Sequence, residues 1–221
     1  MSIARLAIVG GTGPQGRGLA LRFAMAGLAV VVGSRERTKG QGVADAMRAK
    51  HPGLDVRGDE NAAAIADVDV VVLAIAPEGL DATMASLRDG LADRLVIDVV
   101  VPLAFRDGLA EHAPPAGAAS AGELVQATLA RSRVVGGFKT IPASQLLAVD
   151  RPLDGDVLVC SDDAAARTEV AALVARIPSL RAVDAGPMRN ARAIEGITAL
   201  LVNLNRAHRG AHTSIRILGL G

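Results

Sequence analysis

Ile8-Val9-Gly10-Gly11-Thr12-Gly13-Pro14-Gln15-Gly16 is the stretch that decides the fold of this 221-residue chain. It follows an apolar strand, opens a helical pattern and contains the glycine spacing G-x-G-x-x-G. Such a turn needs backbone angles that glycine tolerates best, and without Cβ atoms a pyrophosphate can approach the free N–H groups of the helix. A strand–turn–helix corner without a ligand is the alternative interpretation. We predict a dinucleotide-binding loop formed by Gly11, Thr12, Gly13, Pro14, Gln15 and Gly16.

Apolar, β-branched segments alternate with helical patterns along the rest of the chain. The patterns predict strands over residues 4–9, 29–32, 54–57, 68–75, 94–101, 134–138, 156–160 and 180–183. They predict helices over residues 14–26, 37–50, 61–66, 80–91, 121–131, 163–177 and 189–208, and a loop over 112–119. Such alternation indicates a parallel sheet covered on both faces. We expect an α/β fold, a Rossmann-type doubly wound parallel sheet over residues 1–150, with a small C-terminal α/β extension over residues 151–221.

The end of the second strand indicates which dinucleotide would bind. In NAD-binding proteins an Asp or Glu about 20 residues after the glycine loop binds the ribose 2′-hydroxyl. Here the strand ends in Val32-Gly33-Ser34-Arg35, without a carboxylate, and the run from Arg35 to Lys39 carries a net charge of +2. The Ser34 hydroxyl and the Arg35 guanidinium suit a phosphate. We therefore predict NADP, with its 2′-phosphate bound by Ser34, Arg35 and Lys39. A solvated helix start without a ligand is the alternative interpretation.

Composition excludes several classes of protein. The chain has three phenylalanines, no Tyr or Trp, a net charge of +1 and one cysteine. Modules that stack bases on aromatic rings and Tyr-dependent dehydrogenases are therefore excluded, and we expect no nucleic-acid partner. A single cysteine supports neither a disulfide within the chain nor a thiolate metal cage. No apolar stretch suggests a membrane span and residues 1–6 lack a signal-peptide pattern, so we expect a cytoplasmic protein without a membrane partner.

Ligands of open α/β sheets bind beyond the carboxyl ends of the strands. The loops expected there begin near Ile75-Ala76, Asp98 and Gly136 and contain few ionisable side chains. We expect Ile75 and Ala76 to contact the cofactor. Lys139 is the one that we expect to face a ligand, as a possible catalytic residue, and a surface lysine is the alternative. We otherwise predict no catalytic side chain and no metal site, since hydride transfer between two cofactors depends on positioning. His208 and His212 have a helical spacing but more simply mark a solvated helix end.

The longest predicted helix, over residues 189–208, has an unusually wide apolar surface. Such a helix needs cover on more than one side. An internal core helix and a dimer contact both explain this pattern. The apolar stripe consists of Ile194, Ile197, Leu201 and Leu204, widened by Leu200 and Val202.

Several motifs together resemble the family of coenzyme F420-dependent NADP oxidoreductases. The resemblance runs over essentially the whole chain, and no single motif would be specific by itself. Its residues are Ile8 to Gly13, Gly18 to Arg22, Val32 to Arg35 with Lys39, Thr140-Ile141-Pro142-Ala143, Val159 to Asp163, and Asp184-Ala185-Gly186-Pro187.

The resemblance implies reversible hydride transfer between NADPH and the deazaflavin coenzyme F420. It implies that Thr12, Ser34, Arg35 and Lys39 hold the 2′-phosphate. It further implies that backbone near Ile141 and Ala143 holds the nicotinamide, that the C-terminal part covers the deazaflavin, and that the protein is a homodimer.

Two positions depart from the family pattern. Lys139 replaces a neutral or imidazole side chain, and the loop Ala76-Pro77-Glu78-Gly79 lacks the aromatic residue of some relatives. An NADPH-dependent reductase of another small acceptor, such as an imine or a flavin, and a non-catalytic NADP-binding sensor are the alternative functions.

Overall fold

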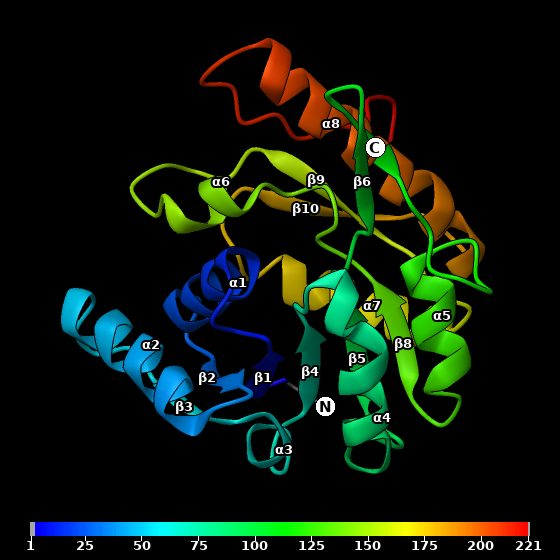
Figure 1. The fold of residues 1–221 in the computed structure, drawn as a ribbon. Helices are drawn as coiled ribbons and strands as arrows, with labels where there is room; N and C mark the ends of the chain where they lie inside the picture. Colours follow the sequence, from blue (N-terminus) through cyan, green and yellow to red (C-terminus); the bar gives the residue numbers. More distant parts are fainter. Residues whose placement is uncertain (1–2, 221) are drawn as a thin grey trace.

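A six-stranded parallel sheet forms the centre of the protein, in the order β3-β2-β1-β4-β5-β8 (Figure 1). The structure is a computed structural model that describes residues 3–220; residues 1 and 2, part of the N-terminal segment considered above, lie outside that range. The order and parallel pairing confirm the predicted Rossmann-type sheet. The strands are β1 (Arg5–Val9), β2 (Ala29–Ser34), β3 (Val56–Glu60), β4 (Val70–Leu73), β5 (Leu95–Asp98) and β8 (Arg133–Gly136).

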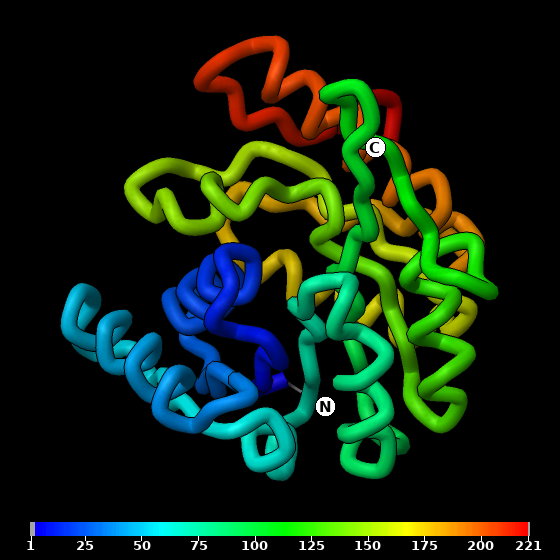
Figure 2. The backbone as a smooth tube through the Cα atoms, viewed as in Figure 1, coloured from blue at the N-terminus to red at the C-terminus, as the bar shows by residue number. Residues whose placement is uncertain are grey.

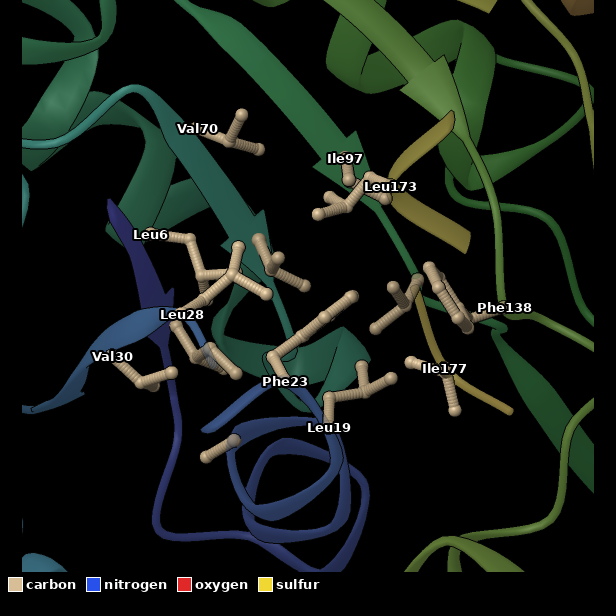
Figure 3. Close-up of a cluster of buried hydrophobic side chains, with 14 of the residues drawn as sticks. Leu6, Leu19, Phe23, Leu28, Val30, Val70, Ile97, Phe138, Leu173 and Ile177 are labelled. Carbon is tan, nitrogen blue, oxygen red and sulfur yellow. The ribbon is translucent and has the colours of Figure 1, made fainter. Parts of the chain in front are cut away.

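Helices cover both faces of this sheet because successive strand residues point to opposite sides. Leu6 and Ile8 of β1 pack in one buried cluster with residues of the helices α1 (Pro14–Met25), α2 (Arg37–Lys50) and α7 (Ala164–Val174) (Figure 3). Ala7 and Val9 pack in a second cluster with residues of α3 (Asn61–Ala64), α4 (Leu80–Leu91) and α5 (Ala121–Thr128). The sheet is therefore doubly wound, as the uninterrupted apolar strands predict.

The C-terminal segment continues this architecture. The parallel pair β9 (Gly155–Val159) and β10 (Leu180–Asp184) meets β8 through one antiparallel bridge between Gly136 and Cys160. Each of the two buried clusters contains residues from both sides of position 150. The division into residues 1–150 and 151–221 stays a prediction.

Three short elements and several boundaries differ from the sequence prediction. A hairpin of β6 (Leu103–Arg106) and β7 (Leu109–His112) and the helix α6 (Ala143–Leu147) were not predicted. The hairpin turns at Asp107-Gly108, and both residues have positive φ. An Asp-Gly pair is a turn signal, but the apolar runs on either side of it are too short to be recognised as strands. β5 ends at Asp98 instead of continuing to residue 101, because the Asp98 carboxylate accepts the N–H of Val100 at 3.0 Å. Two 3₁₀ turns, Pro77–Gly79 and Met188–Asn190, precede α4 and α8.

The longest helix, α8 (Ala191–Ala207), lies beside the hairpin (Figure 2). The Asn203 side chain joins the two, since its amide bonds to both the N–H and the C=O of Ala110, at 2.7 and 2.9 Å. Ile194 and Leu201 are buried, whereas Leu200 is 56% exposed. The apolar stripe is thus partly core and partly surface. No helix within residues 3–220 is long and apolar enough to cross a membrane.

Candidate functional site

The glycine loop between β1 and α1 is closely packed against backbone. The N–H of Gly11 donates to the carbonyls of Ile8 and Gly33, at 3.1 and 2.9 Å. A Cβ on Gly11 would lie 2.8 Å from the Ile8 carbonyl oxygen, and one on Gly16 would lie 2.7 Å from that of Gly10. A Cβ on Gly13 would have its nearest neighbour at 3.6 Å, so this residue faces more open space. The loop therefore has the shape that close approach of a ligand to backbone requires.

The N-terminus of α1 is open to an anion. Its N-cap residue is Gly13, Pro14 occupies the first turn, and no side chain caps the free N–H groups. The first turn also lacks an acidic residue. Unsatisfied N–H groups and the positive end of the helix dipole attract phosphate. The residues present fit the pyrophosphate of a dinucleotide.

The end of β2 carries the predicted 2′-phosphate residues. The Ser34 hydroxyl oxygen accepts the N–H of Glu36 at 3.4 Å, which leaves its own hydrogen free to donate. Arg35 is exposed, and no carboxylate within residues 3–220 forms an ion pair with it. By contrast, Arg37 pairs with Asp59 at 3.0 Å and Lys39 with Glu36 at 2.6 Å. The free cation of this segment is therefore Arg35, a distinction that the net charge of the segment does not make.

A cavity of about 520 Å³ brings Thr12 and Lys39 together. It lies between α1 and α2 and has an apolar floor that includes Leu21, Val43 and Met47. Of the predicted 2′-phosphate residues, Thr12 and Lys39 thus line the same cavity although they belong to different segments of the chain.

The loops after β4 and β8 lie next to the glycine loop. A Cβ on Gly10 would lie 2.5 Å from the carbonyl oxygen of Ala74, which directly precedes the predicted site residues Ile75 and Ala76. Gln15 Nε2 donates to the carbonyls of Phe138 and Ile141, at 3.3 and 3.4 Å. Three separate segments, with Gln15 and Ile141 among the predicted site residues, therefore meet at one edge of the sheet.

Ala143 begins α6, the short helix that follows this loop. Arg22 of α1 holds α6 in place, because its guanidinium donates to the carbonyls of Gln145, Leu146 and Ala148 at 2.7–2.9 Å. The segment that contains Ile141 and Ala143 is thus attached to α1 at both ends.

Lys139 lies where neither sequence interpretation placed it. Its side chain has no exposed area, so it is not a surface lysine, and it does not face an open pocket. Nζ lies 2.6 Å from Asp98 Oδ2 and 3.0 Å from Glu195 Oε1, and it donates to the Val100 carbonyl at 2.5 Å. The expectation of a free ammonium facing a ligand is therefore corrected: these acceptors occupy it.

The charges of this cluster shift one another's ionisation. Burial alone would lower the pKa of Lys139, but the charges of Asp98 and Glu195 outweigh it and raise that pKa above its ordinary value. Burial raises the pKa of Asp98 above its usual range, against the opposing effect of Lys139. Lys139 consequently remains an ammonium and cannot act as a base at neutral pH.

Sequence analysis missed Asp98 and Glu195 as members of one cluster. Glu195 accepts the N–H groups of Ala121 and Gly122, at 3.0 and 3.2 Å, and lies 2.8 Å from His112 Nε2. The type of residue was the available signal. Asp98 is a carboxylate at the end of an apolar strand, and Glu195 is a carboxylate within a long helix that has an apolar stripe. Neither signal identifies its partners.

The remaining reactive side chains have simple structural places. Cys160 is buried, and burial raises the pKa of its thiol to about 12, so it is a packed residue and not a nucleophile. His208 follows the last turn of α8, and His212 Nδ1 lies 2.9 Å from Ser144 Oγ.

Comparison with known proteins agrees with these features. The model of the family "NADP oxidoreductase coenzyme F420-dependent" matches residues 5–102. The F420-dependent NADP reductase of Methanothermobacter thermautotrophicus is 40% identical over 99% of this chain and 96% of its own. That of Methanocaldococcus jannaschii is 37% identical, over 98% and 99%. A crystal structure from Arthrobacter sp. FB24, described as a candidate F420-dependent NADP reductase, superposes with a TM-score of 0.81 at 27% identity, over 98% of this chain and 99% of that one.

Proposed function

The chain belongs to the family of coenzyme F420-dependent NADP oxidoreductases, and we propose that it transfers a hydride between NADPH and coenzyme F420. It is thus an NADP-dependent oxidoreductase whose two ligands are both cofactors. One structural observation supports the NADP half of this proposal most directly. An uncapped helix N-terminus and the end of β2 lie on either side of one glycine loop. The end of β2 has no carboxylate of its own and presents Ser34 and an Arg35 that forms no ion pair within residues 3–220.

At the adenosine end, Ser34, Arg35, Thr12 and Lys39 bind the 2′-phosphate. Arg35 supplies a planar fork of donors, and the Ser34 hydroxyl supplies one more. Lys39 exchanges its exposed ion pair with Glu36 for the phosphate, because a solvent-exposed ion pair contributes little stabilising free energy. Gly11, Gly13, Pro14, Gln15 and Gly16 form the backbone that faces the pyrophosphate.

At the nicotinamide end, Ile75, Ala76, Ile141 and Ala143 surround the reacting ring. When bound, NADPH supplies the hydride, and the protein contributes orientation and the exclusion of water. No free acid or base from this edge is needed for that transfer, and Lys139 has its ammonium occupied by three acceptors. We therefore assign no residue as a proton donor.

The second hydride carrier lies over the same edge. A cavity of about 280 Å³ lies between the loops after β4 and β5, and Pro77, Glu78, Pro102 and Leu103 are among the residues that line it. We expect the second hydride carrier to bind in this cavity. Within the C-terminal part, residues 151–221, the final helix α8 is the element that helps to close the site.

We also propose a cytoplasmic homodimer. Phe105 and Leu109 of the hairpin and Leu200 of α8 are each more than half exposed, on elements that pack together. Large exposed apolar side chains that gather on neighbouring elements are typical of association surfaces. Sedimentation of the purified protein tests the dimer, and a monomer at micromolar concentration would contradict it.

The activity is tested by mixing the purified protein with NADPH and oxidised F420 and following the loss of deazaflavin absorbance. We expect turnover with NADPH and much less with NADH. A free flavin and a cyclic imine are the control acceptors. Tight NADPH binding without F420 reduction would contradict the proposal and would favour another acceptor or an NADP sensor.

A further inference from the structure

A cluster of charged side chains lies inside the protein, at the edge of the sheet where the nicotinamide is proposed to bind. The side chains of Asp98, Lys139 and Glu195 have no exposed area. Fully buried charges are rare because the loss of hydration is offset only by well-placed partners. Binding of the adenosine and pyrophosphate groups uses none of the three, so their presence needs a separate explanation.

The Lys139 ammonium is saturated by protein acceptors. An ammonium has three N–H donors, and the acceptors of Lys139 are Asp98 Oδ2, Glu195 Oε1 and the Val100 carbonyl. No donor is left for a substrate. Any effect of Lys139 on the reaction must therefore pass through the backbone that it holds.

The two carboxylates connect Lys139 to distant elements. Asp98, at the end of β5, also accepts the N–H of Val100. Glu195, in α8, accepts the N–H groups at the start of α5 and contacts His112 of β7. One ammonium thus joins the loops after β5 and β8 to α8, to α5 and to the hairpin.

The backbone around Lys139 is held on further sides. Thr198 Oγ1 of α8 donates to the Lys139 carbonyl at 3.0 Å, and Gln15 of α1 donates to the neighbouring carbonyls of Phe138 and Ile141. Phe138 has a φ of 54°, and its ring packs edge-on against Phe23 with the centroids 5.6 Å apart. An aromatic residue keeps a left-handed conformation only when its surroundings enforce it.

We propose that Lys139 is a positioning residue, which fixes the backbone of residues 138–143 relative to the loop after β5 through its shared bonds to Asp98 and Glu195. This inference rests on the proposed function, in which the same backbone orients the nicotinamide. The groups that would anchor the adenosine and pyrophosphate lie on other loops. Loss of the cluster should therefore slow hydride transfer while leaving NADPH bound, since small misplacements of reacting atoms slow a reaction strongly.

The test uses a variant in which the cluster is neutral but has a similar shape. Lys139→Met alone would leave two buried carboxylates without their partner and could prevent folding. The variant therefore combines Lys139→Met with Asp98→Asn and Glu195→Gln. We expect a folded protein with a Kd for NADPH within about threefold of the original and a kcat lowered at least about tenfold at unchanged KM for F420. If this variant does not fold, Glu195→Gln alone, which keeps the Lys139–Asp98 pair, should give a smaller loss of kcat.

The control removes a comparable ion pair elsewhere. Asp156→Asn with Arg181→Met removes the pair between a buried aspartate of β9 and an arginine of β10, 2.7 Å apart. We expect it to lower thermal stability and to leave kcat unchanged. An unchanged kcat in the neutral-cluster variant, or a fall in kcat matched by an equal loss of NADPH affinity, would overturn the proposal.

A second measurement separates this inference from the proposed function. If the unmodified protein binds NADPH but does not reduce F420, the proposed function fails. The emission of the bound reduced nicotinamide still reports the surroundings of the ring. A change of that emission in the neutral-cluster variant and not in the control supports the role of Lys139, and the same emission in all three proteins overturns it.

Discussion

The two ends of the carboxyl edge of the sheet are built in opposite ways. At the end proposed to bind the adenosine, the glycine loop and the end of β2 lie close together in sequence, and the Arg35 side chain is exposed and unpaired within residues 3–220. At the end proposed to bind the nicotinamide, Asp98, Lys139 and Glu195 come from three distant segments, and their side chains are fully buried. The first end keeps its charge free for a ligand, and the second neutralises its charges within the protein.

This difference indicates that the first end provides binding affinity and that the second end fixes the geometry of the site. An exposed arginine is hydrated in the free protein, so it has little desolvation cost there, and it gains a phosphate partner when the cofactor binds. A buried ammonium whose three N–H groups already bond to protein acceptors has no donor left for the cofactor, but it restricts the movement of the loops around it. Variants at the first end should therefore change binding, and variants at the second should change stability and rate.

The largest expected effect is the loss of stability in Lys139→Met. The variant leaves Asp98 and Glu195 as buried carboxylates without their cation, which lowers the free energy of unfolding by about 3–5 kcal/mol. Urea denaturation measures this. The matched control is Lys39→Met at the adenosine end, where the exposed pair with Glu36 contributes at most about 1 kcal/mol. Equal losses in the two variants would remove the contrast between the two ends.

Gly16→Val should come next, with a loss of NADPH affinity of roughly a hundredfold. A Cβ at this position would lie 2.7 Å from the Gly10 carbonyl oxygen, so the loop must move away from the phosphates. Fluorescence titration with NADPH measures the change. Gly196→Ala in α8, where no atom lies within 4 Å of the added Cβ, is the control and should leave affinity unchanged. Unaltered binding in Gly16→Val would show that the glycine loop does not contact the cofactor.

The double variant Ser34→Ala with Arg35→Ala should weaken NADPH binding by about ten- to a hundredfold and NADH binding by less than about threefold. The reason is that charge-assisted bonds to the 2′-phosphate are absent for NADH. Competition binding with both nucleotides measures the ratio. Arg37→Ala, which removes a cation already paired with Asp59, serves for comparison and should have a smaller effect. Similar losses for NADPH and NADH would contradict the 2′-phosphate assignment.

A smaller effect is expected away from both ends, in the acid dependence of stability. Hydrogen bonds from Arg181 hold the pKa of Asp156 below its usual range, although burial opposes this. A carboxyl with a lowered folded pKa stabilises the protein above its unfolded pKa of about 4, and that contribution is lost as the pH falls through the folded pKa. Asp156→Asn should therefore lower Tm at pH 7, with the difference from the original protein shrinking below about pH 4. A difference that stays constant with pH would exclude this linkage.

Local patterns were sufficient for most of the architecture, and they are the basis for predicting one end of the site. Gly11, Gly13 and Gly16 lie in the closely packed turn that their spacing predicts, and the parallel sheet follows the predicted alternation. The hairpin β6–β7 escaped prediction because its two strands mix apolar with charged residues and lack the buried apolar run that marks β4 and β5. The position of Lys139 escaped it because a charge is buried only where other segments supply its partners.

The sequence by itself determined the doubly wound α/β fold, the glycine loop and the net positive charge of the segment that follows β2. Those properties depend on periodicity and on residues within one βαβ unit, where chain connectivity already sets the geometry. Only the tertiary structure decided that Arg35 has no carboxylate partner among the described residues 3–220 while Arg37 and Lys39 are paired, and that Lys139 is shared between Asp98 and Glu195. Lys139 and Asp98 are 41 positions apart, and the free energy of a charge depends on everything packed around it, which no local stretch of sequence contains.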